Sequence, residues 1–449
     1  MQTRVNLEIF KSYDIRGLYP AELDEVAAER IGRAFVTFTG AQVVAVGRDM
    51  RLSSPALFNA FARGATQQGA DVIDLGLTST DELYFAVGHF GYPAGAMITA
   101  SHNPKEYNGF KLCREEAIAL SAQTGVFAIR DLVDTNDFPA AAKQGLVTSQ
   151  DVLPEFVEHC LSFIDASCIK PLRIVVDCGN GMGGLIVPAV FARLPVEIVP
   201  LYFELDGTFP NHPASPIEPE NMVDLQAAVR RHKADLGAAF DGDADRVFIT
   251  DERGELVGGD MVTALVAKML LRSHPGATIL YNLICSRGVP ELIAREGGHG
   301  IRTRVGHSII KSVMREENAI FGGEHSGHFY FRDHFFADSG LIALLVVLEL
   351  LSRENKPVSE LLRPLDKRYR SGEINSRVDD TAAKLAQLQQ HFADAQEIDH
   401  LDGVTIAYPD WWFNVRPSNT EPLLRLNVEA DTPELLERKR AEILALIRN

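Results

Sequence analysis

Cysteine is scarce in this sequence, and long apolar runs are absent. The five cysteines lie far apart and form no CxxC pair, which argues against a zinc ribbon or a disulfide framework. The longest apolar stretch, residues 340–351, contains Glu349 and is too short to span a bilayer. The first thirteen residues lack the apolar core of a secretory signal. We therefore expect a cytoplasmic protein with reduced thiols and no membrane partner.

Basic residues are also fewer than acidic ones. The chain has 44 Lys and Arg against 61 Asp and Glu, a formal net charge of −17 at pH 7. Such an acidic surface disfavours nucleic acid as a partner, because it repels phosphates. If the protein binds a phosphate, its basic side chains must be gathered locally. The 46% of hydrophobic residues is ordinary for a globular protein, and 449 residues suggest two to four domains.

Three stretches of the chain share one pattern, in which apolar strands alternate with helices and lead to a polar, glycine-containing loop. This alternation indicates parallel α/β units, whose ligands gather outside the carboxyl ends of the strands. A shorter unit of strands and helices follows. We expect an α/β protein of three similar mixed α/β domains and a smaller α+β C-terminal domain around a central active-site cleft. The expected domains cover residues 1–150, 151–254, 255–366 and 367–449.

The loop after the apolar strand at residues 236–240 carries three aspartates, Asp241, Asp243 and Asp245. Carboxylates so close together repel one another unless a cation joins them, and hard oxygen ligands suit Mg²⁺ or Ca²⁺. An EF-hand is rejected because Arg246 stands where that motif requires glycine, and because a strand is expected directly afterwards. The alternative to a metal site is a solvated acidic turn. We call residues 241–246 the aspartate loop.

The serine loop, residues 99–109, places a serine beside basic side chains. Ser101 precedes His102 and lies near Lys111, so it could act as a nucleophile. The Asn-Pro and Asn-Gly pairs that follow are typical of turns and predict that Ser101 is presented on an exposed loop. No GxSxG elbow is present, which argues against an α/β-hydrolase. The alternative is that Ser101 only closes a turn.

Two further loops suit a phosphorylated sugar. Residues 322–328 offer Glu, Ser and His side chains to sugar hydroxyls, and residues 306–308 open a helix whose N–H groups could receive an anion. Residues 416–422 combine an arginine, hydroxyls and an amide in a turn, with Arg425 further on, which is typical of a phosphate-binding loop. Ordinary polar loops are the alternative in both places.

Residues 179–184 fit the GxGxxG pattern of dinucleotide-binding proteins, and Glu204 closes a later strand. This pattern would indicate a dehydrogenase. A dehydrogenase, however, leaves the three aspartates and the serine loop without a purpose. We expect a tight turn between a strand and a helix here instead.

Taken together, the four loops resemble those of the α-D-phosphohexomutase superfamily, phosphomannomutase/phosphoglucomutase group. The resemblance begins at residues 10–17 and runs in order through all four loops. It implies an isomerase that interconverts hexose 1-phosphate and hexose 6-phosphate of mannose and/or glucose. It further implies a phosphoserine enzyme, Mg²⁺, and a glucose or mannose 1,6-bisphosphate intermediate and activator that reorients in the site.

The resemblance also implies roles for individual residues. The serine matching Ser101 is carried as a phosphoserine and holds Mg²⁺ together with the three aspartates. The candidates for the general base are His328, Lys111 and His102, and the sequence does not rank them. The other catalytic positions match Arg16 and Arg246. The substrate-binding positions match Tyr13, His307, Glu324, Ser326, Arg416, Ser418, Asn419, Thr420 and Arg425.

Departures from the family pattern bear on the sugar. Asn419 stands where phosphoglucosamine mutases usually have glycine, which favours mannose or glucose. His325 stands where many dual-specific relatives have methionine. Ile284 replaces a basic residue that touches the substrate, and Arg287 could take over that contact. A phosphoglucosamine mutase, a phosphatase and a noncatalytic sugar-phosphate-binding protein of the same fold are the alternatives. We expect a monomer or a weak dimer.

Overall fold

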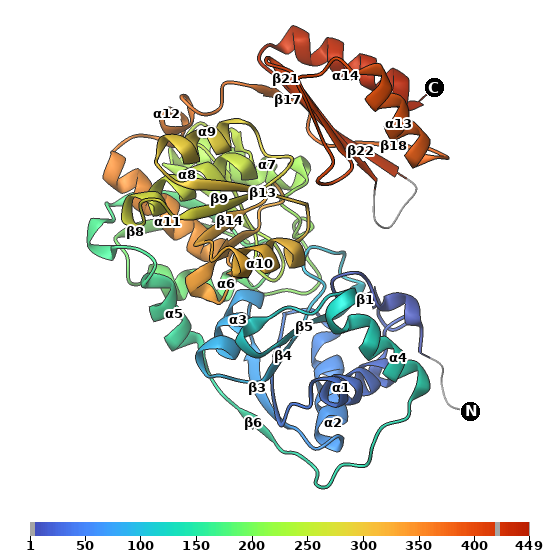
Figure 1. The fold of residues 1–449 in the computed structure, drawn as a ribbon. Helices are drawn as coiled ribbons and strands as arrows, with labels where there is room; N and C mark the ends of the chain where they lie inside the picture. Colours follow the sequence, from blue (N-terminus) through green and yellow to red (C-terminus); the bar gives the residue numbers. More distant parts are fainter. Residues whose placement is uncertain (1–4, 418–422, 449) are drawn as a thin grey trace.

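The computed structural model describes residues 5–417 and 423–448, except for the side chains of residues 307 and 308. It contains four sheets that follow one another along the chain. In Figure 1 the first domain lies at the bottom, the second and third share the middle, and the fourth lies at the upper right. The three α/β domains and the smaller C-terminal domain agree with the predicted fold class.

The first domain is built on a six-stranded sheet in the order β1-β5-β4-β2-β3-β6. Side chains alternate across it, so that Val44 and Val46 face helices α1, α2 and α4 while Ala45 packs on the side of α3. A capping box at Ser79 starts α3. The elements are β1 (Ile15–Leu18), α1 (Glu25–Thr39), β2 (Val43–Arg48), α2 (Ser54–Gln67), β3 (Asp71–Leu77), α3 (Thr80–His89), β4 (Ala94–Ile98), β5 (Tyr107–Arg114), α4 (Phe127–Thr135) and β6 (Val147–Ser149).

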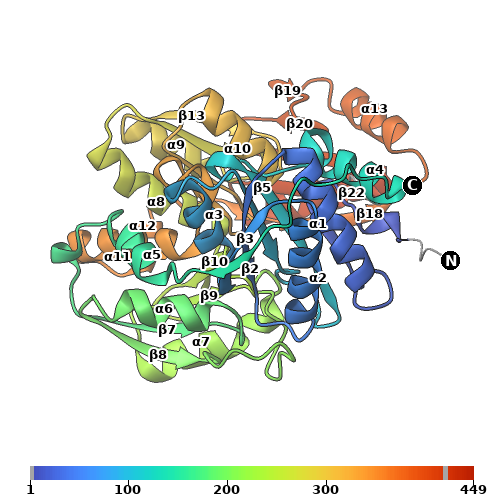
Figure 2. The same ribbon diagram turned by 90° about the horizontal axis from the view of Figure 1, so that it is seen from below.

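The second domain has five strands in the order β11-β10-β9-β7-β8. Figure 2 shows α6 and α7 on either side of this sheet, and the alternation of Ile174, Val175 and Val176 between two cores explains why. Strand β11 extends this sheet beyond the expected boundary at residue 254. The elements are α5 (Leu153–Leu161), β7 (Leu172–Asp177), α6 (Gly183–Phe191), β8 (Val196–Leu201), α7 (Val223–His232), β9 (Leu236–Phe240), β10 (Val247–Thr250) and β11 (Leu256–Val257).

The third domain also has five strands, in the order β13-β12-β14-β15-β16. Its helix α11 is the apolar stretch noted in the sequence, and its residues belong to one hydrophobic core that the second and third domains share. Among the described residues, no helix is long and apolar enough to cross a membrane. The elements are α8 (Gly259–Ser273), β12 (Thr278–Asn282), α9 (Gly288–Arg295), β13 (His299–Thr303), α10 (His307–Glu316), β14 (Phe321–Gly323), β15 (Phe329–Phe331), β16 (Ala337–Asp338), α11 (Gly340–Glu354) and α12 (Val358–Leu362).

The fourth domain is an antiparallel sheet with two helices and a separate core that contains Trp411 and Phe413. Its strands follow the order β17-β22-β21-β20-β19, and β18 also pairs with β22. The elements are β17 (Tyr369–Arg370), β18 (Ile374–Arg377), α13 (Thr381–His391), β19 (Glu397–Asp399), β20 (Val404–Ala407), β21 (Trp411–Pro417), β22 (Leu423–Ala430) and α14 (Pro433–Arg448).

Candidate active site

The first three domains meet at a cavity of about 590 Å³. Main-chain hydrogen bonds join the loops around it: Thr80 N–H donates to the Asp243 carbonyl at 3.0 Å, and Val247 N–H donates to that of Gly327 at 3.2 Å. The strand ends of three separate sheets are thereby brought together. The cavity is lined by Lys11, Ser12, Tyr13, Asp14, Arg16, Tyr84, Ser101, His102, Asn103, Lys111, Asp245, Arg246, His328 and Asp338.

Ser101 lies where the serine loop meets the aspartate loop. Its hydroxyl donates to Asp241 Oδ2 at 2.7 Å and accepts from Arg246 Nη2 at 3.1 Å. The residue is only 4% exposed, so the prediction of an exposed loop was wrong. The Asn-Gly pair was taken for a turn, but Asn108 lies within β5, and Gly242 packs against the Ser101 carbonyl. Ser101 is therefore part of the cavity wall.

The three aspartates form a buried cluster. One oxygen of each lies within 4.8 Å of the others, and the Oδ1 atoms of Asp243 and Asp245 have no hydrogen-bond partner. Burial and the neighbouring Asp243 raise the pKa of Asp245 to about 6. Unpartnered carboxylate oxygens that repel one another are the ligand set that a hard divalent cation stabilises. The residues present therefore fit a metal site.

Basic side chains surround this cluster. Lys111 Nζ donates to Asp243 Oδ2 at 2.8 Å and also to Asp245. Burial opposes its charge, but the two carboxylates outweigh burial and hold the pKa of Lys111 well above its usual range. Arg246 Nε donates to Asp241 at 2.9 Å, and Arg16 Nη1 donates to the Asn103 side chain at 2.6 Å. These cations could stabilise a phosphate.

Two histidines of the cavity stay neutral for related reasons. Burial, Arg246 and Arg16 lower the pKa of His102 to about 2, and its Nδ1 accepts from the Arg246 guanidinium. Burial, followed by Arg246, lowers the pKa of His328 to about 4. The Nδ1 atom of His328 lies 3.1 Å from Ser326 Oγ. Both rings are therefore uncharged at pH 7 and could accept a proton.

Glu324 is buried behind this cavity and is absent from its lining. Its carboxylate accepts from the Gly306 N–H at 3.1 Å and from the Tyr330 hydroxyl at 2.7 Å. Burial raises the pKa of Glu324. This contact ties residues 322–328 to the start of α10. His307 is the first residue of α10, and its side chain lies outside the described part of the chain.

The predicted phosphate-binding arginines lie apart from the cavity lining, in the fourth domain (Figure 1). Arg416 is 4% exposed and donates to Asn427 Oδ1 at 2.9 Å and to Glu373 Oε2 at 2.5 Å. Arg425 lies 3.6 Å from the other oxygen of Glu373. One carboxylate thus faces both arginines. The remaining predicted residues of this loop, Ser418, Asn419 and Thr420, lie outside the described residues.

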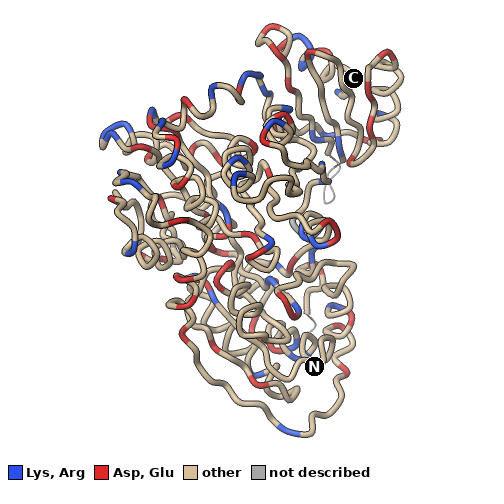
Figure 3. Tube along the Cα trace, turned by 60° about the vertical axis from the view of Figure 1, so that its left-hand side comes forward, with Lys and Arg blue, Asp and Glu red and all other residues tan. Residues whose placement is uncertain are grey.

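Arg287 is directed away from the cavity. Its guanidinium donates to the carbonyls of Tyr408 at 2.8 Å and Pro409 at 3.2 Å, and its N–H donates to Glu429. It therefore joins the third domain to the fourth in this conformation. Figure 3 shows basic and acidic residues interspersed along the chain. Of the lysine and arginine residues predicted for the site, Arg16, Lys111 and Arg246 line the cavity, and Arg287, Arg416 and Arg425 do not.

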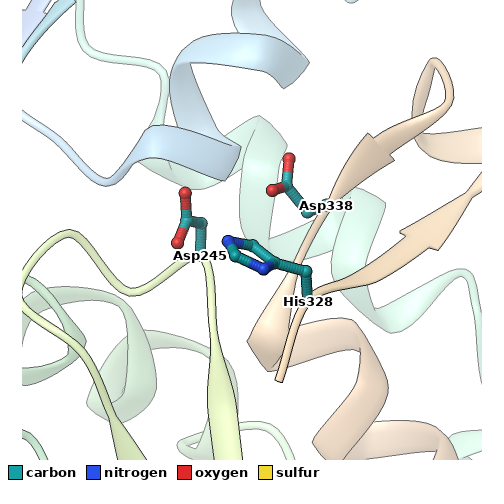
Figure 4. Close-up of side chains that lie close together, drawn as sticks. All are labelled: Asp245, His328 and Asp338. Atoms are coloured by element: carbon teal, nitrogen blue, oxygen red, sulfur yellow. The ribbon is translucent and has the colours of Figure 1, made fainter. Parts of the chain in front are cut away.

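Asp338 is a cavity residue that the sequence reasoning missed. Figure 4 shows the His328 ring between the carboxylates of Asp245 and Asp338, which come from separate segments. Lys311 donates to Asp338 at 2.6 Å, and burial is outweighed by this cation, so the pKa of Asp338 stays well below its usual range. Asp338 ends a strand of two residues, which is too short to give a recognisable pattern in the sequence. Only tertiary proximity identifies it.

The glycine-rich turn at residues 179–184 supports the aspartate loop. Helix α6 begins at Gly183, as a tight turn from strand to helix requires. The Met182 N–H donates to the Gly242 carbonyl at 2.9 Å, and a Cβ on Gly181 would lie 2.7 Å from the same oxygen. Glycine is needed there for close approach of two backbones. The packing of this turn accounts for its glycines without a dinucleotide.

Comparison with known proteins places this geometry in a family. Models of the phosphoglucomutase/phosphomannomutase α/β/α domains I, II and III match residues 7–140, 154–254 and 258–369, and the C-terminal domain model matches residues 373–446. A phosphomannomutase of Salmonella montevideo is 42% identical, covering 99% of this chain and all of its own. A protein of Xanthomonas campestris pv. campestris named phosphohexose mutases is also 42% identical with the same coverage.

Solved structures agree with these matches. A phosphoglucomutase/phosphomannomutase family protein of Burkholderia thailandensis has a TM-score of 0.90 at 33% identity and covers 98% of this chain and 97% of its own. An Aspergillus fumigatus N-acetylphosphoglucosamine mutase, solved with GlcNAc-6P and magnesium, shares the fold at a TM-score of 0.63 and 15% identity, covering 97% of this chain and 94% of its own. The full-length identity to curated mutases shows that this chain is an isomerase of the phosphoglucomutase/phosphomannomutase family.

Proposed function

We propose that this enzyme interconverts the 1-phosphate and 6-phosphate of mannose and/or glucose through a phosphoserine at Ser101. The observation that carries the proposal is the setting of the Ser101 hydroxyl, between Asp241 Oδ2 at 2.7 Å and Arg246 Nη2 at 3.1 Å. A serine in this setting has a cation beside any phosphate it carries and a metal-binding cluster within reach. The Salmonella relative named phosphomannomutase supports the choice of a hexose phosphate.

The reaction then needs two transfers in sequence. In the first, the bond between phosphorus and Ser101 Oγ breaks while a bond forms to the free hydroxyl of the bound hexose phosphate. That hydroxyl loses its proton to a base, and the departing Ser101 oxygen takes up a proton in exchange. The product is a hexose 1,6-bisphosphate. After it turns around, its other phosphate returns to Ser101, whose hydroxyl gives up its proton while the leaving sugar oxygen takes one up. Each transfer conserves the phosphate and one proton.

The acidic residues of the cavity would bind the metal ion, and the basic residues would stabilise the transferring phosphate. Asp241, Asp243 and Asp245, together with the serine phosphate, would hold Mg²⁺, which when bound supplies positive charge for the transferring group. Lys111 and Arg246 add fixed cations beside the same group. Because these phosphoesters break very slowly without catalysis, such electrostatic stabilisation must supply much of the acceleration.

We assign the general base to His328. Lys111 is held protonated by two carboxylates, and His102, whose pKa burial and Arg246 lower to about 2, is the weaker base of the two histidines. His328 is neutral, lines the cavity and lies between two acidic side chains that would stabilise its protonated form (Figure 4). This ring would take the proton from the sugar hydroxyl in the first transfer and return one to the leaving sugar oxygen in the second.

The test is to load the enzyme with glucose 1,6-bisphosphate and measure its intact mass. We expect one added phosphate, which the Ser101→Ala variant cannot carry, together with loss of nearly all mutase turnover. Ser273→Ala is the matched control, because Ser273 is exposed and remote from the cavity lining. Wild-type protein that cannot be loaded would contradict the phosphoserine mechanism. Equal loading of wild type and Ser101→Ala would assign the phosphate to another residue.

A further inference from the structure

Arg51 is a buried arginine that none of the sequence motifs includes. It follows β2 in the first domain, is 1% exposed and is absent from the lining of the cavity. Its guanidinium instead points at the backbone of the serine loop. It donates to four main-chain carbonyls there, those of Ser101 at 2.8 Å, Asn103 at 2.7 Å, Pro104 at 2.7 Å and Tyr107 at 3.0 Å.

The remaining N–H of Arg51 is also used. Its Nε donates to Asp49 Oδ2 at 3.2 Å, while the other oxygen of Asp49 accepts from the Arg51 main chain and from the Ser54 hydroxyl. An arginine has five N–H donors, and all five are now accounted for. Arg51 therefore has no donor left for a substrate, and any effect on the reaction must pass through the serine loop.

The loop that Arg51 holds contains a strained residue. The backbone of Ser101 has a φ of 49°, a left-handed conformation that a residue with a side chain rarely adopts. The Ser101 N–H donates to Thr99 Oγ1 at 2.9 Å, and its carbonyl accepts from Arg51. A Cβ on Gly242 would lie 2.4 Å from that carbonyl oxygen, so the aspartate loop packs tightly on the same group. The Ser101 backbone is thus fixed from three sides.

The second domain covers the other side of the guanidinium. The Phe209 ring lies 5.1 Å from the Arg51 guanidinium carbon, and a Cβ on Gly207 would lie 2.7 Å from the Arg51 Cα. The same domain carries the aspartate loop. Arg51 therefore lies between the loop that bears the serine and the domain that bears its acidic partners.

We propose that Arg51 is a positioning residue for phosphoryl transfer, which holds the strained serine loop so that the Ser101 hydroxyl stays between Asp241 and Arg246. The inference rests on the proposed function, in which Ser101 is the phosphorylated residue. A loosened loop would misplace the hydroxyl without touching the groups that bind the sugar phosphate. The rate of transfer to and from Ser101 should fall, and substrate affinity should not.

The test compares Arg51→Lys and Arg51→Met with Arg48→Lys. Arg48 lies on the same segment, but its partly exposed guanidinium pairs with Asp74, outside the serine loop. For both Arg51 variants we expect phosphoserine formation from glucose 1,6-bisphosphate to slow by about 10- to 100-fold, the range that a misplaced reacting group costs. The dissociation constant of hexose 6-phosphate, measured by calorimetry, should stay within about twofold of wild type under this proposal. Arg48→Lys should change neither quantity.

Three other outcomes would contradict the positioning role of Arg51 or the proposed function. Folded Arg51 variants that form the phosphoserine at the wild-type rate would overturn the proposal, even if their melting temperature falls. Failure of both Arg51 variants to fold would also overturn it, because Arg51 would then serve the fold and not the reaction. If wild type itself forms no phosphoserine, the proposed function fails, and this inference fails with it. The two failures are thereby distinguishable.

Discussion

Replacing Arg416 with alanine tests how the enzyme holds the phosphate that does not react. The proposed turnaround of the bisphosphate requires one anchor for either end of the hexose, and we propose Arg416 of the fourth domain for this role. Its guanidinium is nearly buried and donates to the side chains of Asn427 and Glu373. Alanine removes the charge and leaves the neighbouring strand β22 in place.

The magnitude follows from the charge and burial of this contact. A hydrogen bond from a charged group contributes about 1.5–3 kcal/mol, so Arg416→Ala should weaken substrate affinity by about 10- to 150-fold. In the structure Arg416 already pairs with Glu373, whose side chain is 30% exposed. A phosphate must compete with this carboxylate. Because a partly exposed ion pair contributes about 0.5–1 kcal/mol, Glu373→Gln should tighten substrate affinity by about two- to fivefold.

The assay is steady-state kinetics in both directions, with hexose 1-phosphate and hexose 6-phosphate as substrates. Arg416→Ala should raise the KM of both substrates by similar factors, because one anchor serves both orientations. Phosphoserine formation from a small phosphoryl donor should be nearly unchanged, since that step occurs at Ser101. Arg377→Ala is the control, because Arg377 is an exposed arginine of the same domain.

Two results would refute this reasoning. If Arg416→Ala impaired only one of the two substrates, a shared anchor and the turnaround built on it would have to be abandoned. If Glu373→Gln raised both KM values, Glu373 would be orienting the arginines for the phosphate and not competing with it.

Four further predictions concern the cavity and its surroundings. Exhaustive chelation should abolish activity, Mg²⁺ should restore it and Ca²⁺ should do so poorly; full activity after chelation would contradict the metal site. Gly242→Ala should lower stability by about 1–3 kcal/mol and slow loading of Ser101, as measured by thermal melting and intact mass, because its Cβ would overlap the Ser101 carbonyl. Glu324→Gln weakens the bond to the Gly306 N–H that fixes the loop of Ser326, so it should change the ratio of kcat/KM for mannose and glucose phosphates more than phosphate affinity; an unchanged ratio would remove Glu324 from sugar selection. Burial raises the pKa of Asp81 to about 8, so the folded state binds a proton that the unfolded chain releases, and the free energy of unfolding should fall between about pH 4 and 8 by up to about 1.4 kcal/mol per pH unit. Asp81→Asn should flatten this slope in urea titrations, and an unchanged slope would rule out that assignment.

Local sequence patterns predicted most of the fold. The apolar run at Leu236–Phe240 was expected as a strand and has the same bounds in the structure. Such runs are informative because buried parallel strands must be apolar on both faces, and this requirement is visible in a single segment. The aspartate loop was predicted for the same reason, since Asp241 and its neighbours directly follow such a strand. The clustering of their oxygens needs only a few consecutive residues.

Contacts between distant segments could not be predicted in this way. Arg51 and Ser101 are fifty positions apart and joined by a hydrogen bond, and Asp338 of the third domain lies close to Asp245 of the second. The burial of Ser101 depends on Gly242, which packs against its carbonyl from another domain. Nothing near any of these residues in the sequence indicates its partner. The sequence therefore determined which chemical groups stand at each strand end. The packing of three domains determined which of those groups come into contact, because separation along the chain does not fix the distance between two residues in a folded core.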